Sequence, residues 1–266
     1  MNRRRFLVSL SWIAAAFVAP VASRAQTGAA SREWVEVKCY TCASVEKRDA
    51  LMAVFDNALI PALNRQGASK VGVFRAGDEI NDGNTNYNTS VFVVAAFPTV
   101  EALAASEEKL LADDRFMKDA APIFRAPMKD PLYDACASSL LHAFAACPKV
   151  EQVTASADRL LQLRIYNSYT IERNAKKIAM FEEGGEIAIF RACGMPPVFF
   201  GRAVAGDRLP NLTYMLGFAN QEEKDAAWKK FRAHPDWLKL KADPQYADTA
   251  NKIVNIMLRP SKGSQL

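Results

Sequence analysis

The sequence predicts an α+β protein in which one strand–helix–strand–strand–helix–strand unit occurs twice in tandem. Two segments, EVKCYT at 36–41 and QLRIYN at 162–167, alternate polar and apolar residues as half-buried strands do. A long helical pattern follows each of them and stops at a glycine. Two further strand-like segments, a second helical pattern and a closing apolar segment then come in the same order in both halves.

The first helical patterns cover residues 48–67 and 172–194. Gly67 and Gly194 are expected to end them, because a glycine after the last apolar turn is a common helix stop. Gly184 and Gly185 lie inside the second pattern and predict a break or kink there. The apolar strands KVGVF at 70–74 and PVFFG at 197–201 come next.

The third strands are predicted at 89–97 and 212–218, and each ends in phenylalanine. Thr99 and Asn220 follow as expected N-caps of the second helices. The closing segments are SSLLHAFA at 138–145 and KIVNIMLRP at 252–260. This order of elements is that of the ferredoxin-like (βαββαβ) split unit.

The repeat defines the predicted domains. A first ferredoxin-like repeat is expected at 33–146 and a second at 158–260, joined by a linker at 147–157 and followed by a tail at 261–266. Apolar outer strands of such units are normally covered, so the two sheets are expected to pair within one chain or between chains, and a homo-oligomer is predicted.

Residues 1–25 have the three parts of a secretory signal: a basic start, an apolar run from Phe6 to Ala22 and a small-residue exit, Ser23-Arg24-Ala25, with cleavage expected after Ala25. Arg3-Arg4-Arg5-Phe6-Leu7 resembles the twin-arginine pattern, which favours a bacterial periplasmic or secreted protein. A general secretory signal and a retained membrane anchor are the alternatives.

The charge of the chain changes once this signal is removed. The whole chain has 34 basic and 29 acidic residues. Residues 1–25 hold four arginines and no acid, which leaves 30 basic residues and a net charge of +1. Because the rest of the chain has no long basic block, nucleic acid is not expected as a partner. No stable membrane span is expected in the mature chain.

Five cysteines include a C-x-x-C motif at Cys39 and Cys42. The second repeat has Ile165 and Ser168 at the equivalent positions, so Cys39 is expected to act as a small apolar residue of the sheet. Residues three apart on a strand face opposite sides. No second C-x-x-C and no suitably spaced histidine completes a zinc site, so no metal is predicted, with a redox or metal pair as the alternative.

The alternation also predicts a ligand pocket. Val35, Val37 and Cys39 form an apolar face that is expected to pack on helices. The opposite face carries Glu36, Lys38 and Tyr40 and is expected to line the barrel lumen. The equivalent residues of the second repeat are Gln162, Arg164 and Tyr166. The other candidates, from the later strands, are Tyr214 and Arg202 or Phe200. Such a lumen could hold a small polar or anionic molecule, whereas the alternative is that these charges pair with one another or face solvent.

The chain has two histidines. His234 opens the HPDW motif and is a candidate acid, base or ligand, although His-Pro at a helix start is also ordinary turn chemistry. His142 lies in a predicted strand, where a structural role competes with one as a haem or metal ligand.

These residues carry a resemblance to a known family. IPALNRQG, RIYNS, FRACGMPPVFFG, NLTYMLGF and AWKKFRAHPDW together resemble the NIPSNAP family of the dimeric α/β-barrel superfamily, over residues 33–266. The resemblance implies the fold and leaves the chemistry open, because related families include cofactor-free monooxygenases, haem enzymes and ligand binders.

Three functions therefore remain. The first is an exported protein that binds a small polar or anionic molecule or a protein partner without catalysis, and for which no cofactor is expected. The second is a cofactor-free oxygenase or isomerase, with Arg164 or Lys38 holding an anion and Tyr166 or Tyr40 near the reacting group. The third is a haem protein with a histidine ligand.

Overall fold

The computed structural model describes residues 31–77 and 87–266, so the predicted signal at 1–25 lies outside the described residues. The first half contains four strands: β1 (Trp34–Thr41), β2 (Lys70–Ala76), β3 (Ser90–Phe97) and β4 (Ala135–Ala143). The second half contains β5 (Leu160–Asn167), β6 (Pro197–Ala205), β7 (Asn211–Phe218) and β8 (Lys252–Pro260). These positions follow the predicted repeat closely.

The eight strands form one closed barrel in the order β1-β3-β2-β8-β5-β7-β6-β4. Within each half the strand order is that of a ferredoxin-like unit, and neighbouring strands are antiparallel. The halves meet at two seams, β2 with β8 and β4 with β6. The predicted fold class is confirmed, and the barrel closes within a single chain. Since every strand has two neighbours, closure needs no second copy, and a homo-oligomer stays a prediction.

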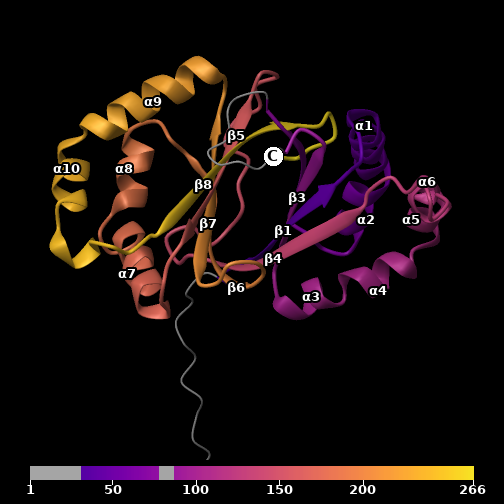
Figure 1. The fold of residues 1–266 in the computed structure, drawn as a ribbon, viewed down its shortest axis with the longest axis horizontal. Coiled ribbons are helices and arrows are strands. Elements are labelled where there is room, and N and C mark those ends of the chain that lie inside the picture. Colours follow the sequence, from indigo (N-terminus) through magenta and orange to yellow (C-terminus); the bar gives the residue numbers. More distant parts are fainter. Residues whose placement is uncertain (1–30, 78–86) are drawn as a thin grey trace, which may run out of the picture.

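The seam between β2 and β8 is short and is completed by the C-terminal tail. Only three residue pairs join the two strands. Beyond them, the Ser261 amide donates to the Val73 carbonyl oxygen at 2.8 Å and the Gln265 amide donates to that of Val71 at 3.1 Å. Leu266 is buried in the cluster that fills the barrel, where Figure 1 shows the C-terminus between the two halves.

The first-half helices begin with a continuous segment that contains a π-helical turn. It comprises α1 (Val45–Val54), the π-turn Phe55–Leu59 and α2 (Ile60–Arg65). Pro61 explains the irregularity, because proline lacks an amide hydrogen and its ring clashes with the carbonyl four residues earlier. Gly67, at φ +92°, ends this segment as predicted. The later helices are short: α3 (Val100–Ala104), α4 (Ser106–Leu111), α5 (Asp114–Asp119) and α6 (Ala121–Phe124).

The second-half helices show the predicted break at the glycine pair. The pattern at 172–194 forms α7 (Ile171–Phe181) and α8 (Glu186–Ala192), and Gly185 lies between them at φ +82°. Gly194 follows α8 at φ +79°. Thr99 and Asn220 cap α3 and α9 as predicted. The remaining helices are α9 (Gln221–Ala233), α10 (Pro235–Lys241) and the 3-10 turn Pro244–Tyr246.

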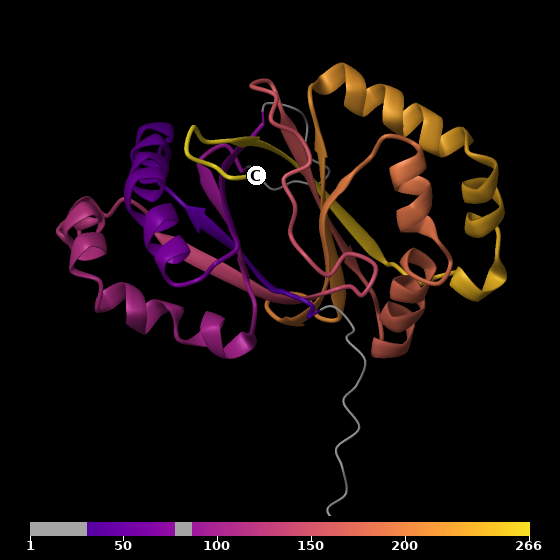
Figure 2. The ribbon, with the colours of Figure 1, turned by 180° about the vertical axis from the view of Figure 1, so that it is seen from behind.

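The helices cover the barrel from two opposite sides. Figures 1 and 2 show α1–α6 on the outer side of the first-half strands and α7–α10 on that of the second-half strands. Three apolar clusters result: one between each half-sheet and its helices, and one inside the barrel. Within the described residues, no helix is both long and apolar enough to cross a membrane.

Candidate functional site

The predicted orientation of the strand faces is wrong. Apolar side chains from all eight strands form the cluster inside the barrel, including Val35 and Val37 of β1 and Leu161 and Leu163 of β5. An eight-stranded barrel is just wide enough for side chains to fill it. The polar faces of β1 and β5 therefore lie under the helices, and the lumen does not hold the predicted pocket.

Arg164 and Tyr166 line a cavity between β5 and helices α8 and α9. Its volume is about 560 Å³. Five aromatic residues line its walls, and the other lining residues are mostly charged. The aromatic residues are Tyr166, Phe190, Trp228, Phe231 and Trp237, and the charged ones are Arg164, Glu186, Lys224, Asp225 and Arg232.

The Arg164 guanidinium is held by aromatic contacts. It lies 5.0 Å from the centre of the Trp228 ring and 5.5 Å from that of Tyr166, both within the range of cation–π attraction. The Trp228 indole N–H donates to Gln162 Oε1 at 2.7 Å, and Gln162 Nε2 donates to Asn255 Oδ1 at 2.6 Å. These bonds fix Trp228, and so the cation is presented to the cavity in a defined position.

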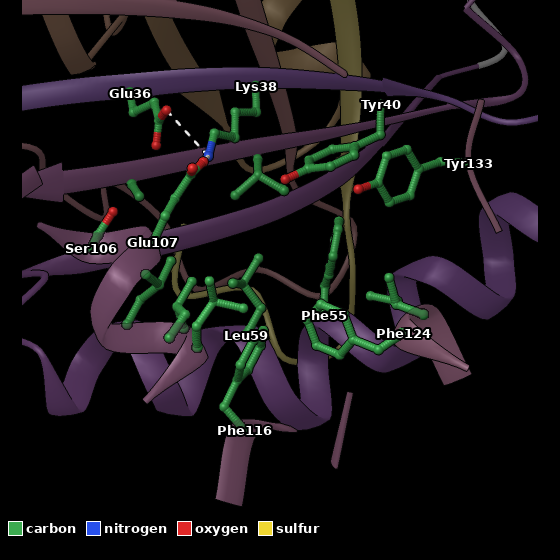
Figure 3. Close-up of a pocket in the computed structure, with 16 residues that line it drawn as sticks. Glu36, Lys38, Tyr40, Phe55, Leu59, Ser106, Glu107, Phe116, Phe124 and Tyr133 are labelled. Atoms are coloured by element: carbon green, nitrogen blue, oxygen red, sulfur yellow. Dashed lines mark hydrogen bonds and ion pairs between the residues drawn. The ribbon is translucent and has the colours of Figure 1, made fainter. Parts of the chain in front are cut away.

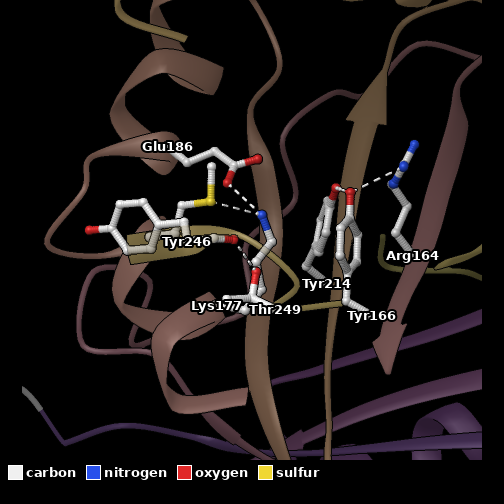
Figure 4. A network of polar contacts seen from close by, with 8 residues as sticks. Arg164, Tyr166, Lys177, Glu186, Tyr214, Tyr246 and Thr249 are labelled. Atoms are coloured by element: carbon white, nitrogen blue, oxygen red, sulfur yellow. Dashed lines mark hydrogen bonds and ion pairs between the residues drawn. The ribbon is translucent and has the colours of Figure 1, made fainter. Parts of the chain in front are cut away.

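A short hydrogen-bonded chain leads from Arg164 into the core (Figure 4). Arg164 Nη2 donates to the Tyr166 hydroxyl at 3.1 Å, and this hydroxyl lies 3.2 Å from that of Tyr214. Tyr214 is fully buried, and burial raises the pKa of its phenol well above the ordinary value. Tyr214 therefore stays protonated and supports Tyr166 without reaching the cavity itself.

A buried ion pair lies on the other side of Tyr166. Lys177 Nζ of α7 and Glu186 Oε2 of α8 are 3.2 Å apart, and both side chains are buried. Lys177 Nζ also lies 4.6 Å from the Phe181 ring centre and 5.3 Å from that of Tyr166. Burial raises the pKa of Glu186, while the Lys177 and Arg164 cations oppose this effect. A second cavity of about 300 Å³ adjoins this pair and shares Tyr166, Glu186 and Trp237 with the first.

Lys38 and Tyr40 line the equivalent space in the first half, between β1 and α4, α5 and the π-turn (Figure 3). The structure thus brings four predicted residues, Lys38, Tyr40, Arg164 and Tyr166, into two repeat-related pockets, with Tyr214 behind Tyr166.

Arg202 and His234 do not join either pocket. Arg202 is exposed on β6 and borders a separate groove against α7. His234 is the N-cap of α10, where its Nδ1 accepts a hydrogen bond from the Asp236 amide at 3.3 Å. His142 stacks on Trp34 with ring centres 4.5 Å apart. Neither histidine lines either pocket, so the residues that line the two pockets do not fit a haem with a histidine ligand.

The C-x-x-C cysteines have different surroundings. Cys39 packs against the cluster inside the barrel, whereas Cys42 is buried in the cluster under the first-half helices. Both are free thiols, and burial raises the pKa of each to about 11. Neither is therefore a thiolate at neutral pH. Among the described residues, no group of three or more His, Cys, Asp or Glu side chains is placed to hold a metal ion.

We expect Cys39→Ala/Cys42→Ser to change the free energy of unfolding by no more than about 1–2 kcal/mol, the usual cost of small changes at buried sites. The second repeat has the same strand without cysteines. Denaturant unfolding checks the stability, and metal analysis with thiol titration checks the chemistry. Loss of a bound metal or of a redox activity in this variant would contradict the structural role.

Sequence reasoning missed Trp228, Lys177 and Glu186. Trp228 stands three residues before the buried Phe231 on α9, so helical spacing could have placed it on the inner face. No comparable signal marked the Lys177–Glu186 pair, because its members lie on two helices whose relative position depends on the turn at Gly184-Gly185.

The comparisons agree with this architecture. Residues 161–265 match the NIPSNAP family model. A provisionally assigned monooxygenase from Lactobacillus acidophilus NCFM has a TM-score of 0.57 at 12% identity, over 86% of this chain and 94% of that one. Another, from Fusobacterium nucleatum, has a TM-score of 0.56 at 9% identity, over 88% and 96%.

An uncharacterised NIPSNAP-like domain protein from Burkholderia xenovorans is 20% identical, over 41% of this chain and 91% of that one, with a TM-score of 0.36. No curated protein matches the sequence significantly. Residues 161–265 thus carry the NIPSNAP match, within a chain that shares the barrel fold of the two provisionally assigned monooxygenases.

Proposed function

We propose that the cavity between β5 and helices α8 and α9 binds a small anionic organic molecule with a flat apolar body. The observation that carries this proposal is the Arg164 guanidinium, held against Trp228 at the wall of a cavity of about 560 Å³. A planar guanidinium suits a carboxylate or similar anion, because it can donate two parallel hydrogen bonds.

The balance of charge around the cavity favours an anion. Three lining residues are cationic, Arg164, Lys224 and Arg232, and two are acidic, Glu186 and Asp225. Lys224 lies 3.7 Å from Asp225, and Lys177 opposes Glu186 from behind the wall. The net charge of the lining is therefore positive, while the aromatic walls suit a flat ring.

Arg164→Met is expected to weaken binding of an aromatic carboxylate such as 2-naphthoate by about tenfold or more, the loss for a charge-assisted hydrogen bond. Titration calorimetry measures the affinity. Lys229→Met removes the same charge from an exposed position of α9 outside the cavity lining and should leave it unchanged. Equal losses in both variants, or no loss in Arg164→Met, would contradict the assignment.

A second candidate function is catalysis on the same ligand, favoured by the Arg164–Tyr166–Tyr214 chain. A phenol beside a guanidinium can orient an enolate or phenolate and exchange a proton with it. Isomerisation would need only that proton transfer, whereas oxygenation would need dioxygen as oxidant. Oxygen uptake with phenolic and enolic substrates separates the two, and Tyr166→Phe should abolish either activity while leaving the fold intact.

We also propose that residues 33–146 are a NIPSNAP-type repeat like the second half, supported by their identical strand order, and that the protein works in the periplasm or outside the cell. The basic and apolar pattern of residues 1–25 supports export.

Arg3→Lys/Arg4→Lys/Arg5→Lys is expected to block export, because the twin-arginine route reads arginines rather than positive charge alone. Cell fractionation followed by immunoblotting measures the exported share. The triple lysine variant keeps the charge of the segment, so undiminished export would instead indicate the general secretory route.

A further inference from the structure

We propose that the first-half pocket is a second ligand site of opposite preference, which binds a primary ammonium group attached to an apolar, ring-sized body. The pocket lies between β1 and the helices of the first half and has a volume of about 290 Å³. It goes beyond the anion site proposed above, because its polar groups and its walls differ from those of the second half.

The polar end of the pocket is acidic. Lys38 Nζ lies 3.3 Å from Glu36 Oε1 and 3.1 Å from Glu107 Oε1 (Figure 3). Burial of Lys38 would lower the pKa of its ammonium, but Glu36 and Glu107 outweigh this effect and raise it. One cation between two carboxylates leaves a net charge of −1, so a second ammonium would balance the group whereas an anion would be repelled.

Glu107 is the residue most able to receive this ligand. Its side chain is 76% exposed on α4, and its carboxylate can turn toward a ligand while Lys38 keeps its contact with Glu36. Glu36 is less exposed and also accepts a hydrogen bond from the Ser138 hydroxyl at 2.8 Å. Glu36 thus fixes Lys38, and Glu107 is the more exposed acceptor at the acidic end of the pocket.

The walls of the pocket suit an apolar cation. Tyr40 and Tyr133 meet edge to face with ring centres 5.0 Å apart, and Tyr40 meets Phe55 in the same way at 4.9 Å. Ring faces next to an acidic end attract an ammonium with an apolar body. Phe124 and Leu111, which also line the pocket, are 47% and 62% exposed and make its entrance apolar.

Comparison of equivalent positions in the two repeats shows which residues make the two sites differ. Lys38 is equivalent to Arg164, and Glu36 is equivalent to Gln162, since both pairs hold the same places on β1 and β5. In the second half the neutral Gln162 bonds to Trp228 and leaves the cavity cationic. In the first half the acidic Glu36 takes that place and, with Glu107, reverses the sign.

The test uses two probes with the same two-ring body and opposite charge, 2-naphthylmethylammonium and 2-naphthoate, titrated against the purified protein at pH 7. We expect Glu107→Gln to weaken ammonium binding about tenfold, the loss for one charge-assisted contact, and to leave naphthoate binding unchanged. Glu108→Gln, an exposed change on the same helix outside the pocket lining, should affect neither probe.

The double variant Glu36→Gln/Glu107→Gln leaves Lys38 without its two carboxylates. When these two changes are combined with Arg164→Met, the protein should no longer bind 2-naphthylmethylammonium and should bind 2-naphthoate in the first pocket. Ammonium binding that is absent, or that is the same in Glu107→Gln and Glu108→Gln, would overturn this proposal. A naphthoate affinity that is unchanged by Arg164→Met would overturn the anion site instead. Failure of the ammonium site and failure of the anion site are therefore distinguishable.

Discussion

Replacement of Lys177 by methionine is expected to lower the free energy of unfolding by about 3–5 kcal/mol, the usual cost of removing one member of a buried ion pair. Lys177 and Glu186 have only 8% and 3% of their side chains exposed, so the loss of the ammonium removes the direct counter-charge of a buried carboxylate. The Glu186 carboxylate would then be buried in the aromatic layer formed by Phe181, Phe190 and Tyr166 without its counter-charge.

The loss should depend on pH in a defined direction. Burial raises the pKa of Glu186 in the folded protein, so folding favours its protonated form. The protonated Glu186 therefore stabilises the folded protein at pH values below the pKa that this carboxyl has in the unfolded chain. This contribution is lost as the pH rises through its pKa in the folded protein. Removing Lys177 raises the folded pKa further. The variant should therefore come closest to the wild type in acid and fall furthest below it at neutral pH and above.

Urea unfolding of both proteins between acid and neutral pH measures this difference. Lys176→Met is the matched control, because Lys176 belongs to the neighbouring exposed pair with Glu172 on the same helix and should cost under about 1 kcal/mol. Lys177→Met/Glu186→Leu should recover most of the loss, since apolar replacement of a whole buried pair is often neutral. A loss of similar size for Lys176 and Lys177, unchanged by pH, would contradict the buried pair.

The sequence repeat predicted the fold well because the positions of strands and of helix ends depend on local patterns. Alternation located β1 and β5, and glycines at 67 and 194 marked the helix ends at positive φ. Alternation separates the two faces of a strand but does not say which face turns inward. In this barrel both faces are buried, one by the opposite strands and one by helices.

The candidate site was predicted in part for the same reason. Lys38, Tyr40, Arg164 and Tyr166 do share one face, and this face does border pockets. The partners that give these residues their character come from helices distant in sequence. Glu107 lies 69 residues after Lys38, and the spacing of charges along the chain gives no sign of that contact.

The polar face of each half-sheet therefore provides a binding surface only because a helical layer closes over it. Tyr40 and Tyr166 hold equivalent places, yet Tyr166 bonds to Arg164 and Tyr214 whereas Tyr40 packs against Phe55 and Tyr133. One scaffold thus supports two chemical environments, and the interior of the barrel keeps the halves together.

Phe199→Ala tests whether the barrel interior holds the two halves together. This change is expected to lower the free energy of unfolding by about 3–5 kcal/mol, the range for removing a buried phenylalanine side chain. Phe199 is fully buried inside the barrel, opposite Met215 on β7. Phe199 belongs to the apolar cluster that fills the barrel, to which all eight strands contribute. An alanine at 199 would leave a cavity that such a closed barrel cannot readily collapse.

Urea unfolding measures this loss of stability. Tyr169→Ala, at a site 78% exposed, is the aromatic control, and its free energy of unfolding should stay within about 0.5 kcal/mol of that of the wild type.

The affinities for 2-naphthoate and 2-naphthylmethylammonium decide which space is the pocket. Both should survive Phe199→Ala under conditions where the variant is folded, because Phe199 faces away from both cavities. Leu163→Ala and Arg164→Met repeat the test on neighbouring residues of β5, the first lowering stability and the second lowering naphthoate affinity. A stable Phe199→Ala variant that has lost ligand binding would move the site back into the barrel lumen.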